Sequence, residues 1–228
     1  MFIHGFDCFK RSPNLNYKIV DMDTIRLKNT QFLIKLVVLS LFYCNSLNLN
    51  SQSSTLKYNI LHKGKAMGSL ETTRVIINDS VTYNSYVDIE YHLLATIRIQ
   101  HKNSTVYFND VLWHSKVLSE VGKKGKNISE VKKTKDGYIY TKNSDKPKSI
   151  NQSISFSVER LFFEEPVGLS KVFSEEKGEF HKLETSGKHQ YTKTAPNGHK
   201  SVYFYQNGTL VKTEIDAGII EFEMILSN

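Results

Sequence analysis

The sequence predicts a mainly β domain: a strongly curved antiparallel sheet, or half-barrel meander, with one short helix. Three observations support this fold class. Short runs of β-branched and aromatic residues recur along residues 55–118 and again after residue 170, with turn residues between them. Several of these runs alternate apolar and polar side chains, which is typical of strands with one buried face. Only one segment carries helix signals.

The chain begins with the three-part layout of a secretory signal peptide. Basic residues at 26–28 precede an apolar run at 36–43, and a polar stretch follows at 45–52. The whole apolar segment is shorter than the roughly 20 residues that a transmembrane helix needs. We therefore expect export and no integral membrane span once this leader is removed.

The boundaries of the leader follow from the same layout. Met22 opens a more conventional leader than Met1, so we expect residues 1–21 to be an extension of the gene model and residues 22–51 to be the signal peptide. Cleavage near Ser51 leaves residues 52–228 as a single β-rich domain. Lipidation of Cys44 stays an alternative, although Tyr43 stands where a lipoprotein signal has a small residue.

Cysteine usage points to the compartment. Both cysteines, Cys8 and Cys44, lie before the predicted cleavage site, so the mature chain has none. An exported protein without disulfides favours a bacterial periplasmic or secreted location. Five glycosylation triplets suit a eukaryotic glycoprotein instead, but a chain rich in Asn, Ser and Thr produces such triplets by chance. They begin at Asn78, Asn103, Asn127, Asn151 and Asn207.

The charge of the mature chain argues against nucleic-acid binding. The full chain has a formal net charge of +7. Residues 1–51 contain six of its 30 Lys and Arg and three of its 23 acids, which leaves 24 bases, 20 acids and a net charge of +4. The lysines at 122–135 are diluted by acids and lack interleaved aromatics. We interpret this stretch as a solvated loop.

The first half of the domain predicts consecutive strands with short turns. Residues 78–80 and 102–104 carry the turn signals. The predicted strands cover residues 56–62, 68–77, 81–94, 96–101 and 105–117. Residues 143–148 form a further polar loop. These elements predict an antiparallel meander.

The second half begins with the single helix-like segment, at 157–166. Ser157 suits the N-cap, Glu159 suits the first turn, and Pro166 ends the helix. Turns follow at 196–198 and 206–208, since Asn-Gly tolerates the positive φ of tight hairpins. In the last strand, Ile220, Phe222, Met224 and Leu226 alternate with Glu221 and Glu223, which predicts one buried and one wet face.

The segment from Ser155 to Met224 resembles a family of uncharacterised exported bacterial proteins, a β-rich domain of unknown function. The resemblance rests on the order of residues 157–166, 172–175, 178–180, Tyr191, 196–198, 203–205 and 207–210. More distantly, the layout is similar to the half-barrel of periplasmic lipoprotein carriers, in which a curved sheet wraps a few helices around an apolar hollow. Neither resemblance implies catalytic residues.

No catalytic motif stands out, and we expect a protein that is not an enzyme. Gly168-Leu169-Ser170 lacks the closing glycine of a nucleophile elbow. The histidines lack the close spacing of zinc ligands, and His181 and His189 are interpreted as surface residues of strands. Adjacent acids at 164–165 and 175–176 would point apart in a strand. We therefore expect no metal and no cofactor.

Aromatic residues are the candidates for ligand binding. If the sheet encloses a hollow, it would be lined by Phe108, Trp113, Phe162, Phe163, Tyr203 and Phe204, and such a lining suits an apolar ligand. The alternative is that these side chains fill the core. Trp113 shares a strand face with Val111 in regular alternation, which favours the core for that residue.

These observations predict an exported, non-catalytic protein that binds or carries an apolar or envelope-derived ligand, such as a lipid, in a curved β-sheet. This hypothesis rests on likeness of fold. The alternative is a structural or interaction component of the bacterial cell envelope, with another envelope protein as partner. A roomy apolar cavity would favour the carrier, and a filled core with an exposed apolar patch would favour the interaction protein.

Overall fold

The computed structural model describes residues 51–227 apart from 93–95, 123–124, 217 and 219. The predictions for residues 1–50, including most of the signal peptide and Cys44, lie outside the described residues. The predicted β fold class is confirmed. The described residues form fourteen strands in one antiparallel sheet.

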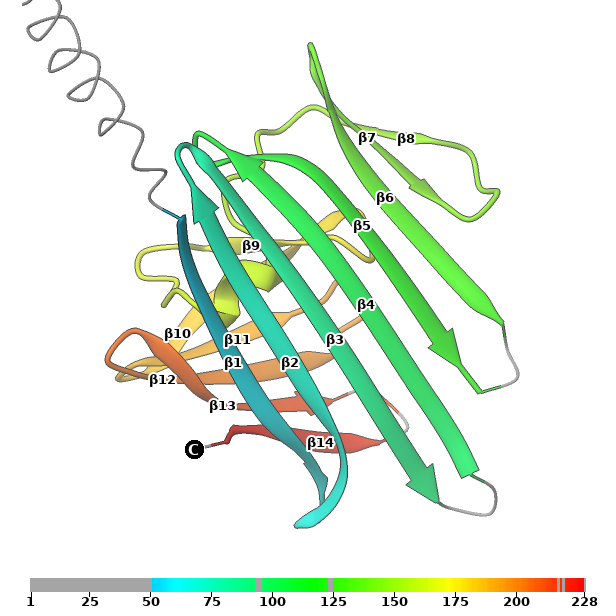
Figure 1. Ribbon diagram of the computed structural model, residues 1–228, viewed down its shortest axis with the longest axis vertical. Helices are drawn as coiled ribbons and strands as arrows, with labels where there is room; N and C mark the ends of the chain where they lie inside the picture. The colour runs from blue at the N-terminus through cyan, green and yellow to red at the C-terminus, as the bar shows by residue number, and fades with distance from the viewer. Residues whose placement is uncertain (1–50, 93–95, 123–124, 217, 219, 228) are drawn as a thin grey trace, which may run out of the picture. The chain divides into compact units, whose positions relative to one another are not determined.

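The fourteen strands follow one another along the chain as a double meander (Figure 1). They are β1 (Ser51–His62), β2 (Lys65–Ile77), β3 (Ser80–His92), β4 (Thr96–Phe108), β5 (Val111–Val121), β6 (Lys126–Thr134), β7 (Gly137–Lys142), β8 (Lys148–Ile150), β9 (Lys171–Ser174), β10 (Glu179–Gly187), β11 (Gln190–Thr194), β12 (Lys200–Gln206), β13 (Thr209–Asp216) and β14 (Glu221–Leu226). Their order in the sheet is β8-β7-β6-β5-β4-β3-β2-β1-β14-β13-β12-β11-β10-β9. Because β1 pairs with both β2 and β14, it joins the two halves.

The sheet curves strongly but does not close by a backbone ladder. Its edge strands, β8 and β9, pair with β7 and β10 and not with each other. Side chains join the two ends instead: the hydroxyls of Tyr140 and Ser129 donate to the carbonyl oxygen of Glu176, at 2.7 and 2.9 Å. Lys148 Nζ donates to the carbonyl of Gly178 at 3.3 Å. The domain is therefore barrel-like without being a closed barrel.

Register shifts bend strands in both halves of the sheet. The pairing shifts at Ile60/Leu61, at Val106/Tyr107 and at Phe204/Tyr205. Such β-bulges insert an extra residue, increase the local twist and bend the strand. They allow a sheet of this width to curl, so that inward side chains of both halves share one interior.

The connection between β8 and β9, residues 151–170, runs through that interior. It contains a short 3₁₀ helix, η1 (Val158–Phe162), which lies behind β2 and β3 in the view of Figure 1. Leu161 is completely buried, and the Phe162 ring lies 5.7 Å from that of Tyr58. We call residues 151–170 the plug segment. It packs against both hydrophobic core clusters of the domain.

Four predictions about local structure are confirmed. The chain turns at Asn78-Asp79 and at 195–199, and residues 143–147 form a loop. Asn207 and Gly208 make the β12–β13 hairpin with φ values of 51° and 78°. The positive φ values explain why Asn-Gly marks this turn.

Three other local predictions are wrong. Residues 102–104 do not turn, because β4 runs through them and buries Asn103. Lys126–Thr134 is the strand β6, whose Val131 is fully buried, so Lys126, Lys132 and Lys133 are exposed residues of a strand and do not belong to a loop. The one short helix is present as the 3₁₀ element η1, but the predicted Ser157 cap is wrong, because this side chain makes no capping hydrogen bond. Its hydroxyl is used by the interior network instead.

We predict that Gly178→Ala destabilises the fold by about 2–4 kcal/mol, because a β-carbon adds both strain at positive φ and overpacking. Gly178 has φ +62°, and a β-carbon there would lie 2.3 Å from the Tyr140 ring. Gly208→Ala is the matched control, with φ +78° and open space around it. It should cost only about 1–2 kcal/mol. Urea unfolding measures the loss of stability in both variants. Equal losses would contradict the tight packing of Tyr140 against Gly178, where side chains join the two edges of the sheet.

Candidate functional site

The centre of the interior is polar. Its buried polar side chains come from the inner face of the first half of the sheet, from the plug segment and from the residue after β9. They are Thr72, Ser85, Asn103, Thr105, Ser115, Ser129, Ser157, Glu159 and Glu175. Buried polar groups are stable only when they are hydrogen-bonded. The hydroxyls of Thr105 and Ser115, for example, share a hydrogen bond of 2.8 Å.

Glu159 of η1 binds two neighbouring strands of the sheet. One carboxyl oxygen accepts a hydrogen bond from Asn103 Nδ2 at 2.8 Å, and the other is in hydrogen-bond contact with the Ser85 hydroxyl. Ser85 in turn contacts the Thr72 hydroxyl at 2.7 Å. Thr105 Oγ1 donates to Asn103 Oδ1 at 2.9 Å. The plug segment is thus tied to β2, β3 and β4 through one side chain.

Glu175 holds the other side of η1. Its carboxylate accepts hydrogen bonds from the Ser157 hydroxyl and from the backbone amides of Val158 and Glu159. The distance from Glu159 N to Glu175 Oε1 is 3.3 Å. Tyr107 Oη donates to Ser157 Oγ at 2.7 Å. Ser157 therefore lies between Tyr107 of β4 and Glu175.

Burial controls the charge of this carboxyl pair. Burial, reinforced by the nearby Glu175, raises the pKa of Glu159 to about 8, and burial also raises the pKa of Glu175. Glu159 is therefore protonated at neutral pH and can donate a hydrogen bond as well as accept one. The side chains of Glu159 and Glu175 are only 4% and 2% exposed. Their direct role in this conformation is to hold the plug segment.

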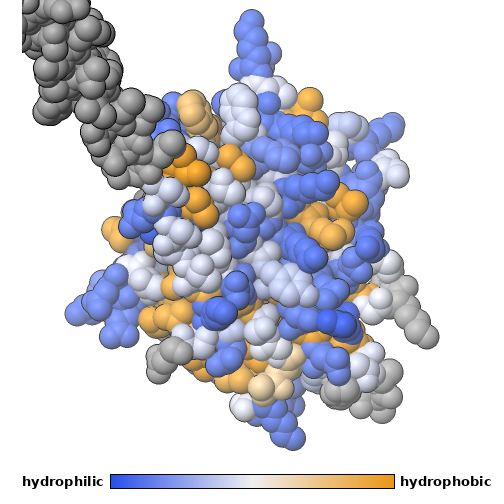
Figure 2. Space-filling view, in the orientation of Figure 1, coloured by the Kyte–Doolittle hydropathy of each residue, from blue (hydrophilic) through white to orange (hydrophobic). Residues whose placement is uncertain are grey.

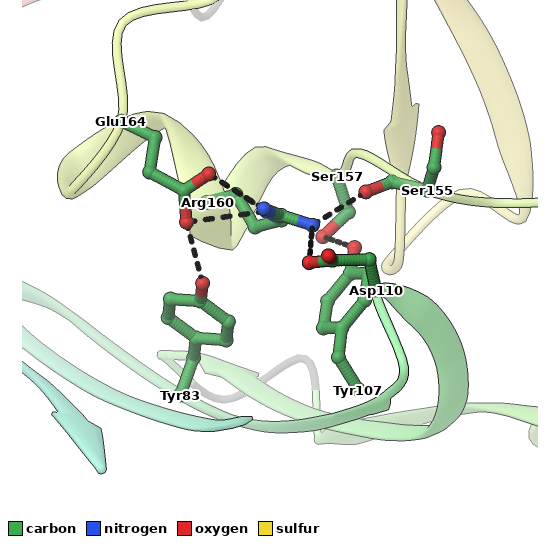
Figure 3. Close-up of polar contacts among 7 residues, drawn as sticks. All are labelled: Tyr83, Tyr107, Asp110, Ser155, Ser157, Arg160 and Glu164. Atoms are coloured by element: carbon green, nitrogen blue, oxygen red, sulfur yellow. Dashed lines mark hydrogen bonds and ion pairs between the residues drawn. The ribbon is translucent and has the colours of Figure 1, made fainter. Parts of the chain in front are cut away.

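A second cluster centres on Arg160 (Figure 3). Its Nη2 donates to Glu164 Oε2 at 2.6 Å, and Tyr83 Oη donates to Glu164 Oε1 at 2.8 Å. Nη1 donates to the carbonyl of Ser155 at 2.8 Å and to Asp110 at 3.4 Å. The guanidinium also lies over the Tyr107 ring, 5.1 Å from its centroid. Arg160 links η1 to the turn between β4 and β5.

The two ends of the interior differ in chemistry. We call the end at the 63–64 turn the apolar end, and the end at the 78–79 turn the arginine end. At the apolar end, six partly buried apolar side chains from both halves of the sheet pack against one core cluster: Met67, Val87, Tyr91, Ile99, Ile215 and Phe222. Figure 2 shows hydrophobic surface in the lower part of the view, toward this end.

The six predicted ligand residues do not form one site. Phe162 and Tyr203 are buried in the interior, and Phe163 lies between the two core clusters. Phe204 alternates with the buried Tyr203 and Tyr205, so it lies on the outer face. Phe108 and Trp113 are 49% and 56% exposed, with ring centroids 6.5 Å apart.

Trp113 is not in the core, because a bulge changes its direction. Val106 pairs with His114 and Tyr107 pairs with Leu112, which leaves Trp113 as the extra, unpaired residue. The alternation that favoured a core position assumed a regular strand. Trp113 and Phe108 instead line an outer groove of about 340 Å³ together with Val106 and Ser80.

The outer face of the first half is otherwise mainly hydrophilic, with separate hydrophobic patches (Figure 2). A groove of about 630 Å³ crosses β2 to β5 there, and most of the residues that line it are polar, among them Glu71, Asn84, Tyr86 and Lys102. The predicted surface position of His181 is wrong: it is buried on the inner face of β10, and burial lowers its pKa.

Within the part of the chain that the structure describes, no three His, Cys, Asp or Glu side chains are placed to hold a metal ion. Nor does any helix of the described residues have the length and apolar character that crossing a membrane requires.

Sequence reasoning missed the residues that organise the interior: Arg74, Glu159, Arg160 and Glu175. One signal was available. The run 158–162 places an acid and a base side by side among Val, Leu and Phe, and an element that is mostly apolar buries whatever charges it carries. The partners of the Glu159 carboxyl come from strands more than 50 residues away, and no local pattern identifies them. Arg160, by contrast, pairs with Glu164 four residues on.

Comparisons with known proteins agree with this architecture. A family model described as "Domain of unknown function (DUF6134)" matches residues 58–227. No curated protein matches the sequence. Among solved structures, the chain is similar to a beta-barrel-like protein of domain of unknown function DUF1849 from Brucella abortus, with a TM-score of 0.51 and 9% identity over 76% of this chain and 95% of that chain. At this identity the likeness concerns the fold alone.

We predict that Glu159→Gln flattens the pH dependence of stability. The folded protein binds the Glu159 proton up to about pH 8, whereas an ordinary glutamate releases it near 4.5. Between these values the folded state binds more protons, so rising pH lowers the free energy of unfolding of the wild type. Gln stays neutral at every pH. In Glu159→Gln, the decrease in the free energy of unfolding between pH 5 and 8.5 should therefore be smaller than in the wild type by roughly 1–3 kcal/mol.

Urea unfolding across this pH range measures the effect. Glu184→Gln is the control, because Glu184 is an exposed side chain that pairs with Lys182. It should keep the wild-type slope. If Glu159→Gln also keeps that slope, Glu159 is ionised in the folded protein and the account of the network is wrong.

Proposed function

Given that the chain belongs to the DUF6134 family of domains of unknown function, we propose that it is an exported, non-catalytic protein that binds an apolar ligand at the apolar end of its curved sheet. One observation carries the proposal. Six inward-facing or core-packed apolar side chains stay partly exposed at that end, although they come from both halves of the sheet. Exposed apolar surface that lies together favours a binding site.

The filled centre limits where this ligand binds. Glu159 and its partners occupy the middle of the interior, so an apolar chain cannot run through the domain without displacing the plug segment. The proposed ligand therefore enters only as far as η1. A lipid acyl chain is the chemistry that suits such a shallow apolar opening.

The cellular location and the non-catalytic role are parts of the same proposal. Export is supported by the three-part leader at 26–52, and a periplasmic or secreted location in bacteria by the lack of cysteine after residue 51. A non-catalytic role is supported by the use of the two buried carboxyls: both hold η1.

A second candidate is an interaction protein of the cell envelope. The Phe108–Trp113 groove favours it, because two large aromatic side chains stand exposed beside each other on an outer face. Exposed aromatic residues are enriched where proteins bind one another. In this case the apolar end would be only an incompletely covered core.

We predict that Ile99→Asp weakens binding of the neutral fluorescent probe N-phenyl-1-naphthylamine at least about tenfold, which corresponds to ~1.4 kcal/mol. A carboxylate among the apolar side chains of this end opposes an apolar probe. Ile128→Asp is the matched control, since Ile128 is 42% exposed on the outer face of β6. It should bind the probe like the wild type.

Circular dichroism checks that each variant folds, and Tyr91→Ser is a second variant at the same end. A probe that does not bind the wild type contradicts the proposal. So does a probe that binds every folded variant equally.

For the second candidate, we predict that Trp113→Ser removes a protein partner from the complex isolated from its own cells. Native mass spectrometry detects the partner, and Trp113, the single tryptophan, reports it by a blue shift of its emission. A co-purified lipid that Trp113→Ser retains would instead support the first candidate. A partner that Trp113→Ser retains excludes the aromatic groove as its docking surface.

A further inference from the structure

Arg74 points into the arginine end of the interior. It belongs to β2, three residues before the strand ends at Ile77, on the same face as the buried Leu70 and Thr72. In the register of the sheet, its Cα partners are Tyr83 of β3 and Ser54 of β1. The side chain is partly buried, so the guanidinium can be reached from solvent.

No group of the described residues neutralises this cation. Its Nε is buried and has no hydrogen-bond partner, and no described carboxylate forms an ion pair with it. Its one specific contact is with the Phe163 ring, whose centroid lies 5.1 Å from the guanidinium carbon. A partly desolvated charge without an ionic partner is costly, and the contact with an aromatic face recovers only part of that cost.

The partly buried carboxylate at this end of the interior is already engaged. Glu164 accepts hydrogen bonds from Arg160 and from Tyr83, and Arg160 balances its charge. Asp110 also contacts Arg160 and is 83% exposed. The positive charges of Arg160 and Arg74 both act to lower the pKa of Tyr83, whereas burial and Glu164 raise it by more. The cluster therefore contains two arginines and a single partly buried carboxylate, Glu164, which is 29% exposed.

We propose that Arg74 is the anchor of a binding site for an oxyanion, a carboxylate or phosphate group, at the arginine end of the domain. The planar guanidinium fork matches both groups and can bind them with two parallel hydrogen bonds. Phe163 holds the guanidinium plane, and Arg160 keeps Glu164 from repelling the anion. This site lies at the end of the interior opposite the proposed apolar site and does not depend on it.

The test is calorimetric titration of the full domain with potassium phosphate and with potassium acetate, at constant ionic strength set with potassium chloride. Arg74→Gln should weaken binding of these anions at least about tenfold. Arg98→Gln is the matched control, because it removes one arginine charge from the outer face, where Arg98 pairs with Asp88. It should bind like the wild type.

Vesicles distinguish the source of the anion. If free phosphate and acetate do not bind, but phosphatidylglycerol vesicles bind the wild type and Arg98→Gln more tightly than Arg74→Gln, the anion is a lipid headgroup. Phosphatidylcholine vesicles control for apolar binding. Failure of every anion to bind, or equal binding by all three proteins, overturns the proposal.

A stability measurement guards against a folding defect. In buffer without oxyanions, Arg74→Gln should be at least as stable as the wild type, because it removes an unpaired charge. A large loss of stability would mean that Arg74 has a partner within the fold, which also overturns the proposal. Arg74→Lys keeps the charge without the fork and should bind the anions with intermediate affinity.

Discussion

The fold depends on how the Glu159 carboxyl is buried. The sheet curls without closing, so its interior must be filled by the chain that connects its two edges. That connection contains one short helical element, η1. The Glu159 carboxyl of η1 binds Ser85 and Asn103, and Glu175 accepts hydrogen bonds from backbone amides of η1. A charged Glu159 would be too costly there; a protonated one satisfies the sheet and η1 together.

This arrangement decides where function can lie. The polar centre and η1 occupy the middle of the interior, so the surfaces that a ligand could reach are its two ends and the outer face. The ends are chemically opposite: one gathers partly exposed apolar side chains such as Ile99 and Phe222, and the other presents the unpaired Arg74. The outer face adds the aromatic pair Phe108 and Trp113, and a bulge turns Trp113 away from the core. This barrel-like fold thus has three chemically distinct surfaces, and none of them depends on a central cavity.

The antiparallel meander, the Asn-Gly hairpin at 207–208 and the turn at 78–79 could be predicted from the sequence, because each depends on neighbouring residues alone. The turn at 102–104 was predicted wrongly since Asn103 is a turn residue by propensity, yet its amide is needed by Glu159, which lies 56 residues away. Ser157 was expected to cap a helix for the same local reason, and its hydroxyl serves Glu175 and Tyr107 instead. Trp113 was misplaced because a β-bulge leaves no clear mark in the alternation of side chains. The candidate sites depend on such long-range contacts, so the sequence indicated their residue types but not their positions.

The most direct test of the central claim is an NMR titration of the Glu159 side-chain carboxyl carbon in ¹³C-labelled protein, with Glu159→Gln to assign the signal. We expect a protonated carboxyl at neutral pH and a midpoint near pH 8. A midpoint close to the ordinary glutamate value of 4.5 would contradict it. In that case the interior would hold an ionised carboxylate, and the plug segment would need another explanation for its place inside the sheet.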